Sequence, residues 1–289
     1  MNHNINFGGI PERYCNKENS PIVILPVPYD GTSTWIKGAN KGPEAIIEAS
    51  ANMELYDIET NTEIYKKGIY TAPSILEESS VEAMVKAVLH EVSKYIEQNK
   101  FVVAIGGEHS ISIGAIKAYG LHFYDLTILQ LDAHSDLRQK YEGSKYNHAC
   151  VMARAKEICK IVQVGIRSMD KEETEYITPE NIFYAHFINK YSNTNNNEWI
   201  NEVINSLTTN VYITIDLDVF DPAYLPATGT PEPGGLSWQQ INDLLTAVNK
   251  NRNIVGFDVT ELCPNKYSKA SDFLAAKLIY RILSMKFSK

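Results

Sequence analysis

The chain has 289 residues and a formal net charge of −8, and 44% of its residues are hydrophobic and 21% charged. This length and composition suit one globular domain with a substantial core, and we predict a single domain over residues 1–289. The acidic balance, without any block of Lys and Arg, excludes a general nucleic-acid-binding protein.

Short apolar runs rich in Val and Ile recur along the chain, and each ends in glycine, proline or a charged residue. Because these runs are apolar on both faces, they are typical of strands in a parallel sheet that is covered on both sides. They span residues 22–27, 101–105, 127–131, 161–166, 211–217 and 254–259.

Segments with helical spacing lie between these runs. Residues 79–100 predict a long helix, and Ser79 with Glu82 predicts a capping box at its start. Ser237 is the predicted N-cap of a helix over 237–251, and 271–287 predict a C-terminal helix, whereas the polar segment 189–199 predicts a surface loop. The alternation of strands and helices predicts an α/β fold, a three-layer α/β/α sandwich with a mostly parallel sheet.

The sequence also indicates the compartment. No apolar run approaches the roughly 20 residues that span a bilayer, and the first residues lack the basic and apolar regions of a secretory signal. The four cysteines form no CxxC pair, so we expect free thiols in a reducing compartment. We therefore expect a cytoplasmic protein without a membrane partner.

Three predicted strands end in residues that bind metal ions. GGEHS follows the second run, DAHSD the third, and DLDVFDP closes the fifth. Ligands of parallel α/β sheets bind at the carboxyl ends of the strands, so these side chains can converge. The six candidate ligands are His109, Asp132, His134, Asp136, Asp216 and Asp218.

The spacing within these motifs favours convergence. Side chains two residues apart in an extended segment share a face, which applies to Asp132, His134 and Asp136. Four buried carboxylates would repel one another strongly unless they bind cations. Two divalent ions would balance the four charges, and carboxylate and imidazole ligands without thiolate favour a harder metal such as Mn²⁺.

Each motif alone has an ordinary structural explanation. A single Asp at a strand end is usually a cap or a turn residue, and His109 alone could be a core histidine. Three such motifs, each following a buried strand, favour a two-metal site.

The same three motifs resemble those of the ureohydrolases, the arginase and agmatinase family. The likeness extends to PVPYDGTSTWIKGANKGPEAI (26–46), TGTPEPGGLS (228–237) and DVTELCP (258–264). It covers nearly the whole chain and implies an arginase/deacetylase-like fold. Glu108 departs from the pattern, since agmatinases often carry Asp there, but it is not a ligand position.

The resemblance implies two Mn²⁺ ions per subunit. His109, Asp132, Asp136 and Asp216 would hold one ion, and Asp132, His134, Asp216 and Asp218 the other. It also implies a homo-oligomer, a trimer or a hexamer.

The resemblance is closest to agmatinase, which implies a small cationic guanidine substrate, agmatine, and the products urea and putrescine of polyamine biosynthesis. The segment 142–155 and the residues around Glu232 both look like agmatinase. Asn147 and Arg154 stand where agmatinases vary, so aminopropylagmatine is an alternative substrate.

The implied mechanism uses a metal-activated water that attacks the guanidinium carbon. Asp136 would pass the proton to the leaving amine, and His148 would exchange protons with solvent. Glu261 would pair with the guanidinium, whose planar fork matches a carboxylate. The alternatives are a surface-loop role for His148 and a structural ion pair for Glu261.

Other functions fit the fold. They are a ureohydrolase acting on arginine, guanidinobutyrate or formimidoylglutamate, a one-metal zinc deacetylase, and an inactive relative that serves as a regulatory subunit. The complete set of six ligands argues against the last two.

Overall fold

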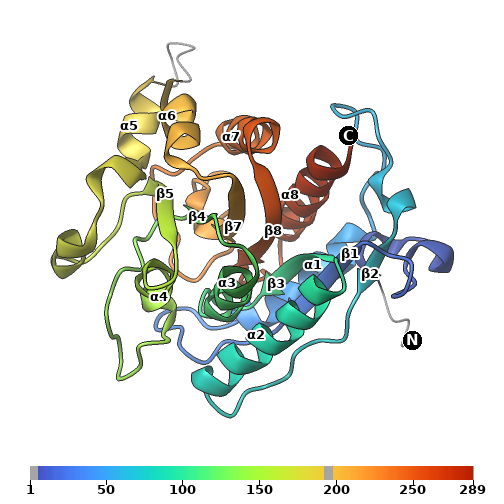
Figure 1. Cartoon of the computed structure of the whole chain (residues 1–289), viewed down its shortest axis with the longest axis horizontal. Helices are drawn as coiled ribbons and strands as arrows, with labels where there is room; N and C mark the ends of the chain where they lie inside the picture. The colour runs from blue at the N-terminus through green and yellow to red at the C-terminus, as the bar shows by residue number, and fades with distance from the viewer. Residues whose placement is uncertain (1–5, 192–197, 289) are drawn as a thin grey trace.

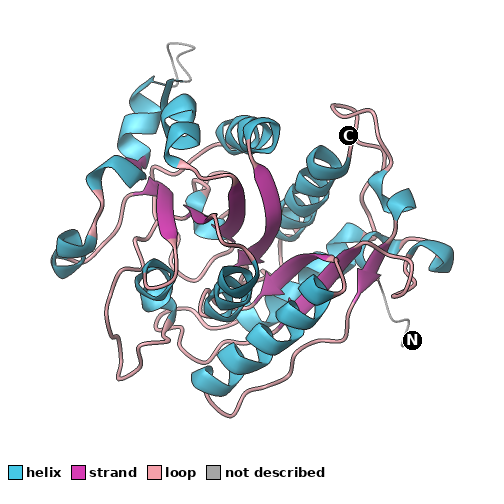
Figure 2. Cartoon of the chain, viewed as in Figure 1, coloured by secondary structure: helices cyan, strands magenta, loops and turns pink. Residues whose placement is uncertain are grey.

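The fold was obtained as a computed structural model, which describes residues 6–191 and 198–288. Eight strands form one sheet in the order β2-β1-β3-β8-β7-β4-β5-β6, and all neighbouring strands are parallel (Figure 2). The strands are β1 (Ile22–Val27), β2 (Ile69–Thr71), β3 (Phe101–Gly106), β4 (Leu126–Leu131), β5 (Lys160–Ile166), β6 (Ile182–Tyr184), β7 (Asn210–Asp216) and β8 (Asn253–Thr260).

Helices cover both faces of this sheet. Figure 1 shows α2, α3 and α4 on one side and α5, α6, α7 and α8 on the other, so the predicted three-layer α/β/α class is confirmed. The helices are α1 (Gly42–Ser50), α2 (Val81–Glu97), α3 (Ile111–His122), α4 (Val151–Lys156), α5 (Ala185–Tyr191), α6 (Glu198–Ser206), α7 (Trp238–Asn251) and α8 (Ala270–Phe287).

The strands have two apolar faces because each face contributes to a separate core. In β1, Ile22 and Ile24 belong to the core that includes side chains of α1 and α8, whereas Val23 and Leu25 belong to the core that includes side chains of α2 and α3. Successive strand residues point to opposite faces. The continuous apolar runs in the sequence therefore follow from burial on both sides.

Six predicted strands are confirmed, but β2 and β6 were not predicted. Each has three residues and lies at an outer edge of the sheet, so neither produces a long apolar run. Helix α3 was also missed, because it is buried over most of its surface and lacks an amphipathic period.

Two local predictions are wrong. Helix α2 begins one residue later than expected, and its N-cap is Ser80, whose hydroxyl accepts from Ala83 N at 3.1 Å. Ser79 instead donates to the Glu77 carboxylate. The predicted loop 189–199 is helical at both ends, in α5 and α6, and its residues 192–197 lie outside the described part of the chain.

Other expectations hold. Ser237 caps α7, and Gln240 completes a capping box with it. All four cysteines are free thiols. In the part of the chain that the structure describes, none of the helices combines the length and the apolar character that a membrane span needs.

Candidate metal and active site

The candidate ligands meet at the carboxyl edge of the sheet. Strands β3, β8, β7 and β4 are neighbours in that order, so the segments that follow β3, β7 and β4 lie together. Five of the six predicted ligands are buried, and His134 is partly exposed. We call Asp132, Asp136, Asp216 and Asp218 the aspartate cluster.

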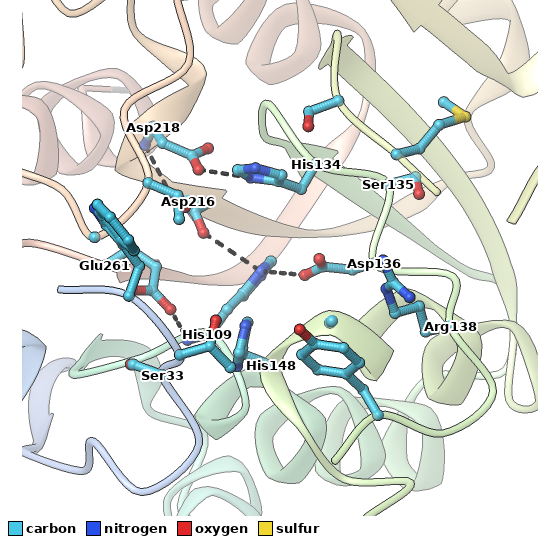
Figure 3. Close-up of a pocket in the computed structure, with 18 of the residues that line it drawn as sticks. Ser33, His109, His134, Ser135, Asp136, Arg138, His148, Asp216, Asp218 and Glu261 are labelled. Atoms are coloured by element: carbon cyan, nitrogen blue, oxygen red, sulfur yellow. Dashed lines mark hydrogen bonds and ion pairs between the residues drawn. The ribbon is translucent and has the colours of Figure 1, made fainter. Parts of the chain in front are cut away.

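His109 lies among three of these carboxylates, and Figure 3 shows it with two of them, Asp136 and Asp216. Its Nδ1 atom is 2.9 Å from Asp136 Oδ2, 3.2 Å from Asp132 Oδ2 and 3.7 Å from Asp216 Oδ2. Potential ligand atoms of His109, Asp132 and Asp136 all lie within 4.8 Å of one another. The three side chains therefore surround a space of the size that a metal ion fills.

A second group shares Asp132 with the first. Potential ligand atoms of Asp132, His134 and Asp218 also lie within 4.8 Å of one another. His134 Nδ1 is 2.8 Å from Asp218 Oδ2 and 3.7 Å from Asp132 Oδ1. Because Asp132 belongs to both groups, its carboxylate lies between two adjacent candidate metal positions.

The hydrogen bonds of His109 show that a cation fits the first position. Its Nε2 atom is 2.8 Å from Thr214 Oγ1, and this hydroxyl donates to Asp258 Oδ1 at 2.7 Å. A hydroxyl has one proton, so Nε2 must be the donor to Thr214. In the neutral ring, Nδ1 then carries a lone pair that points at carboxylate oxygens, and the atom makes no hydrogen bond. A cation between these atoms removes the conflict.

The proton equilibria of the site follow from the same crowding. Burial raises the pKa of Asp132 to about 7, and the charges on Asp218 and Asp136 add to the rise. Burial and Asp218 also raise the pKa of Asp216 well above its usual range. Burial opposes ionisation of Asp218 as well, but His134 outweighs it and lowers the pKa of Asp218 to about 2.

The imidazoles show the opposite effect. Burial lowers the pKa of His109, but Asp132 and Asp136 outweigh it and raise the pKa well above 6.5. Burial also lowers the pKa of His134, but the charge and hydrogen bond of Asp218, together with the charges of Asp132 and Asp136, outweigh it and raise the pKa to about 10. Without a cation, the site therefore retains protons to balance its charge.

The local backbone differs from the predicted extended alternation. Asp216 ends β7, but Asp218 lies in a 3-10 helix (Leu217–Val219) and donates its backbone N–H to Asp216 Oδ1 at 2.9 Å. Asp136 has φ 52°, so the chain turns there. Glu261, which follows β8, has φ 65°. Non-glycine residues rarely adopt this left-handed backbone, and such residues concentrate at functional sites.

A cavity of about 290 Å³ opens over the cluster. It is lined by His109, His134, Asp136, Asp216 and Asp218, and also by both remaining predicted site residues, His148 and Glu261. Glu261 Oε1 accepts from His109 N at 2.7 Å, as Figure 3 shows. Burial raises the pKa of Glu261 well above its usual range, and the charge of Glu108 contributes.

Three residues noted for substrate choice do not line this cavity. Asn147 is buried and caps the 3-10 helix that carries His148. Arg154 donates to the carbonyls of Gln139 and Lys145, both at 3.0 Å, so it supports a loop. Glu232 Oε1 is 3.9 Å from His134 Nε2.

Three charged residues of the cavity wall were not predicted from the sequence. Arg138, Asp170 and Glu173 line it, and Arg138 NH2 is 3.2 Å from Asp170 Oδ2. Asp170 and Glu173 follow β5. The rule that ligands lie at strand carboxyl ends, applied to this fourth strand, would have pointed to them.

Comparison with known proteins places this geometry in context. A model of the arginase family matches residues 20–284. An N(1)-aminopropylagmatine ureohydrolase of Synechocystis sp. is 39% identical over 283 residues, which cover 94% of this chain and 91% of that protein. An agmatinase of Pyrococcus horikoshii is 31% identical, with 93% of each chain covered.

A solved structure is similar throughout. The crystal structure of the agmatine ureohydrolase of Thermoplasma volcanium matches with a TM-score of 0.86 and 32% identity, covering 96% of this chain and 94% of that chain. The similarity therefore extends over nearly the whole chain.

Proposed function

The chain belongs to the arginase family and is a ureohydrolase, and on this premise we propose that it hydrolyses the guanidine group of agmatine to urea and putrescine. The observation that carries the proposal is the cavity itself. It brings together the two candidate metal groups, a partly buried carboxylate at Glu261 and an imidazole at His148.

A second candidate substrate is N1-aminopropylagmatine, which has the same guanidine with a longer amine tail. Relatives from Synechocystis sp. and Thermus thermophilus, 39% and 36% identical, carry the name N(1)-aminopropylagmatine ureohydrolase. Asp170 in the cavity wall offers a carboxylate to a cationic tail. Hydrolysis of this substrate would release urea in the same way.

We propose that the cofactor is a pair of Mn²⁺ ions, held as the six-ligand pattern predicts. The lone pair of His109 Nδ1 and the oxygen-rich donor set, which contains no thiolate, support this assignment. When bound, such ions polarise the substrate and lower the pKa of water.

The chain's own residues then have distinct tasks. The Glu261 carboxylate binds the guanidinium, because a planar fork of N–H donors matches its two oxygens. The positive charge of the substrate guanidinium lowers the pKa that burial raises at Glu261, so the carboxylate ionises and the two groups form an ion pair. Asp136 lines the same cavity, where it accepts a proton and returns it to the leaving amine.

His148 exchanges protons between the cavity and solvent. It is partly exposed and lines the cavity, so one side of its ring can face the substrate while protons reach it from outside. An imidazole suits this task because it gains and loses a proton near neutral pH.

We further propose that the protein acts in the cytoplasm as a homo-oligomer, a trimer or a hexamer, without nucleic-acid or membrane partners. Its acidic charge and the family resemblance support these expectations. Sedimentation of the purified protein would measure the subunit number.

Urea release from agmatine, aminopropylagmatine and arginine, measured side by side with Mn²⁺, tests the proposal. We expect release from agmatine, and activity on aminopropylagmatine alone would replace it with the second candidate. Arginine as the only substrate would contradict both. Asp132→Asn is the inactive control that separates enzymatic release from contamination.

A further inference from the structure

A buried carboxylate outside the proposed ligand set lies next to His109. The Glu108 side chain is fully buried and accepts from four donors. They are Thr32 N at 2.7 Å, Thr32 Oγ1 at 2.8 Å, Ser33 Oγ at 3.3 Å and Ser110 Oγ at 2.5 Å. The chain therefore satisfies this carboxylate with its own donors, and Glu108 is free for a task other than metal binding.

The Thr32 hydroxyl links this carboxylate to the predicted proton shuttle. Thr32 Oγ1 accepts from His148 N at 3.0 Å and lies 3.0 Å from His148 Nδ1. The hydroxyl has a single proton, and the Glu108 carboxylate can only accept. The proton therefore points to Glu108, and His148 Nδ1 must be the donor to Thr32.

This hydrogen-bond count defines the form of the ring. With its proton on Nδ1, neutral His148 carries the free lone pair on Nε2. The ring of Tyr141 lies edge-on to it, with the ring centroids 6.1 Å apart. Nδ1 is occupied by Thr32, so Nε2 is the atom that can serve the cavity that His148 lines.

The fold brings the three residues together through a close backbone approach. Gly107 N donates to Val27 O and Glu108 N to Tyr29 O, both at 2.9 Å. A Cβ at Gly107 would lie 1.8 Å from Tyr29 O, so only glycine permits this contact. Gly106 and Gly107 do not have positive φ. The glycine thus serves packing of the loop after β1, which carries Thr32, rather than a tight turn.

We propose that Glu108 and Thr32 are positioning residues for His148, which hold its ring by Nδ1 and present Nε2 to the substrate. The proposal rests on the proposed function. When Nε2 takes a proton, Nδ1 retains its own proton and continues to donate it to the Thr32 hydroxyl. The negative charge of Glu108, which accepts from that hydroxyl, stabilises the resulting imidazolium. Release of the proton from Nε2 to solvent restores the neutral ring.

Threonine variants test the proposal away from the metal ligands. Thr32→Val keeps the shape of the side chain but removes the hydroxyl, and we expect kcat to fall about ten-fold with KM unchanged. Thr32→Ser retains the hydroxyl and should stay within about two-fold of the parent. In the His148→Gln background, Thr32→Val should cause no further loss. A parental kcat for Thr32→Val would overturn the proposal, as would an equal loss in Thr32→Ser.

Glu108→Gln tests the carboxylate. The amide can donate, so the Thr32 hydroxyl is released to donate to Nδ1, and we expect a similar loss of kcat with two metal ions retained. Solid-state ¹⁵N spectra of protein loaded with diamagnetic Zn²⁺ report the ring directly, with His148→Gln identifying the signal. We expect an Nδ1–H tautomer in the parent and its partial loss in Glu108→Gln. An Nε2–H tautomer in the parent would overturn the proposal.

These measurements separate two kinds of failure. If the parent releases no urea from any guanidine, the proposed function fails while the ¹⁵N spectra still report whether Glu108 and Thr32 hold the ring. If the parent is active and Thr32→Val is indistinguishable from it, the positioning role fails while the proposed function stands.

Discussion

Two regions at the same edge of the sheet bury carboxylates and balance their charge differently. Glu108 accepts from four donors of the chain itself. In the aspartate cluster, Asp132 accepts from two donors, Asp216 from one backbone N–H, and Asp218 from one backbone N–H beside the His134 imidazole. Burying an uncompensated charge costs several kcal/mol. The Glu108 region can therefore form without any ion, and the aspartate cluster is the region whose charge calls for one.

The comparison separates positioning from binding. A carboxylate satisfied by the chain holds its neighbours in place, as Glu108 holds Thr32. A carboxylate left short of donors keeps oxygens available for a ligand. Both kinds of acid stand at strand ends in the sequence, so their donors, rather than their positions, distinguish them.

The largest expected effect comes from breaking the aspartate cluster at the residue shared by its two groups. Asp132→Asn should reduce kcat on the order of a thousand-fold, because one amide oxygen replaces the carboxylate that the two candidate metal groups share. Urea assays and metal analysis by mass spectrometry measure the two effects. Retained activity with two ions per chain would remove Asp132 from the proposed mechanism.

The same variant should have the opposite effect on the metal-free protein. Because the pKa of Asp132 is raised from 3.8 to about 7, the stability that its protonated form contributes is present at low pH, declines as the pH rises from 3.8 through about 7, and is lost at pH 8. Thermal unfolding of chelated samples at pH 8 should give a higher Tm for Asp132→Asn than for the parent. Equal Tm values would show that the cluster is less strained than its geometry indicates.

A smaller loss is expected at Glu261, which is proposed to contact substrate rather than metal. Glu261→Gln removes the charge of a charge-assisted pair worth about 1.5–3 kcal/mol, so kcat/KM should fall about ten- to a hundred-fold. Metal content should not change. If the variant loses its ions instead, Glu261 supports His109 through the His109 N–H bond and the substrate role is wrong.

Adding metal should stabilise the parent by an amount that grows with the logarithm of the metal concentration above its Kd. A ligand at a hundred times its Kd contributes about 2.7 kcal/mol to the free energy of unfolding. Calorimetric scans with and without Mn²⁺ measure this difference. The ¹⁵N signal of His148 should keep its tautomer in chelated protein, because the Glu108 region does not depend on the ion. If removing the metal changed both the stability and the His148 tautomer, the Glu108 region would depend on the ion as the aspartate cluster does.

The smallest effect concerns a buried group that is neutral and needs neither donors nor a cation. Burial raises the pKa of the Cys150 thiol to about 11, so at pH 8 only on the order of 0.1% is thiolate. Iodoacetamide should therefore label the more accessible Cys15 first, as peptide mass spectrometry would show. Rapid labelling of Cys150 with loss of activity would instead identify it as a reactive thiol.

The sequence predicted the centre of the molecule better than its margins. Strands such as β4 are apolar on both faces and end in a charged motif, so their position and the convergence of their acids could be inferred. The edge strand β6 has three residues and leaves no such pattern. The link from Glu108 to His148 joins residues far apart in sequence through Thr32, and only the packing around Gly107 brings them together.

The local geometry was harder to infer than the residue types. Alternation explained why Asp132 and His134 are neighbours, but Asp136 is placed by a left-handed turn and Asp218 by a 3-10 helix. Neither feature follows from hydrophobic periodicity. The N-cap of α2 shows the same limit, since two adjacent serines compete and the acceptor at Glu77 decides between them.

The left-handed backbone at Asp136 and Glu261 also limits how the enzyme can diversify. Glycine and short polar residues such as Asn tolerate this conformation, and branched or bulky ones do not. Laboratory selection for a new amidine substrate would find few viable side chains at these two positions. New specificities should arise instead from the cavity rim, at Trp35, Tyr141 and Asp170, where no such backbone constraint applies.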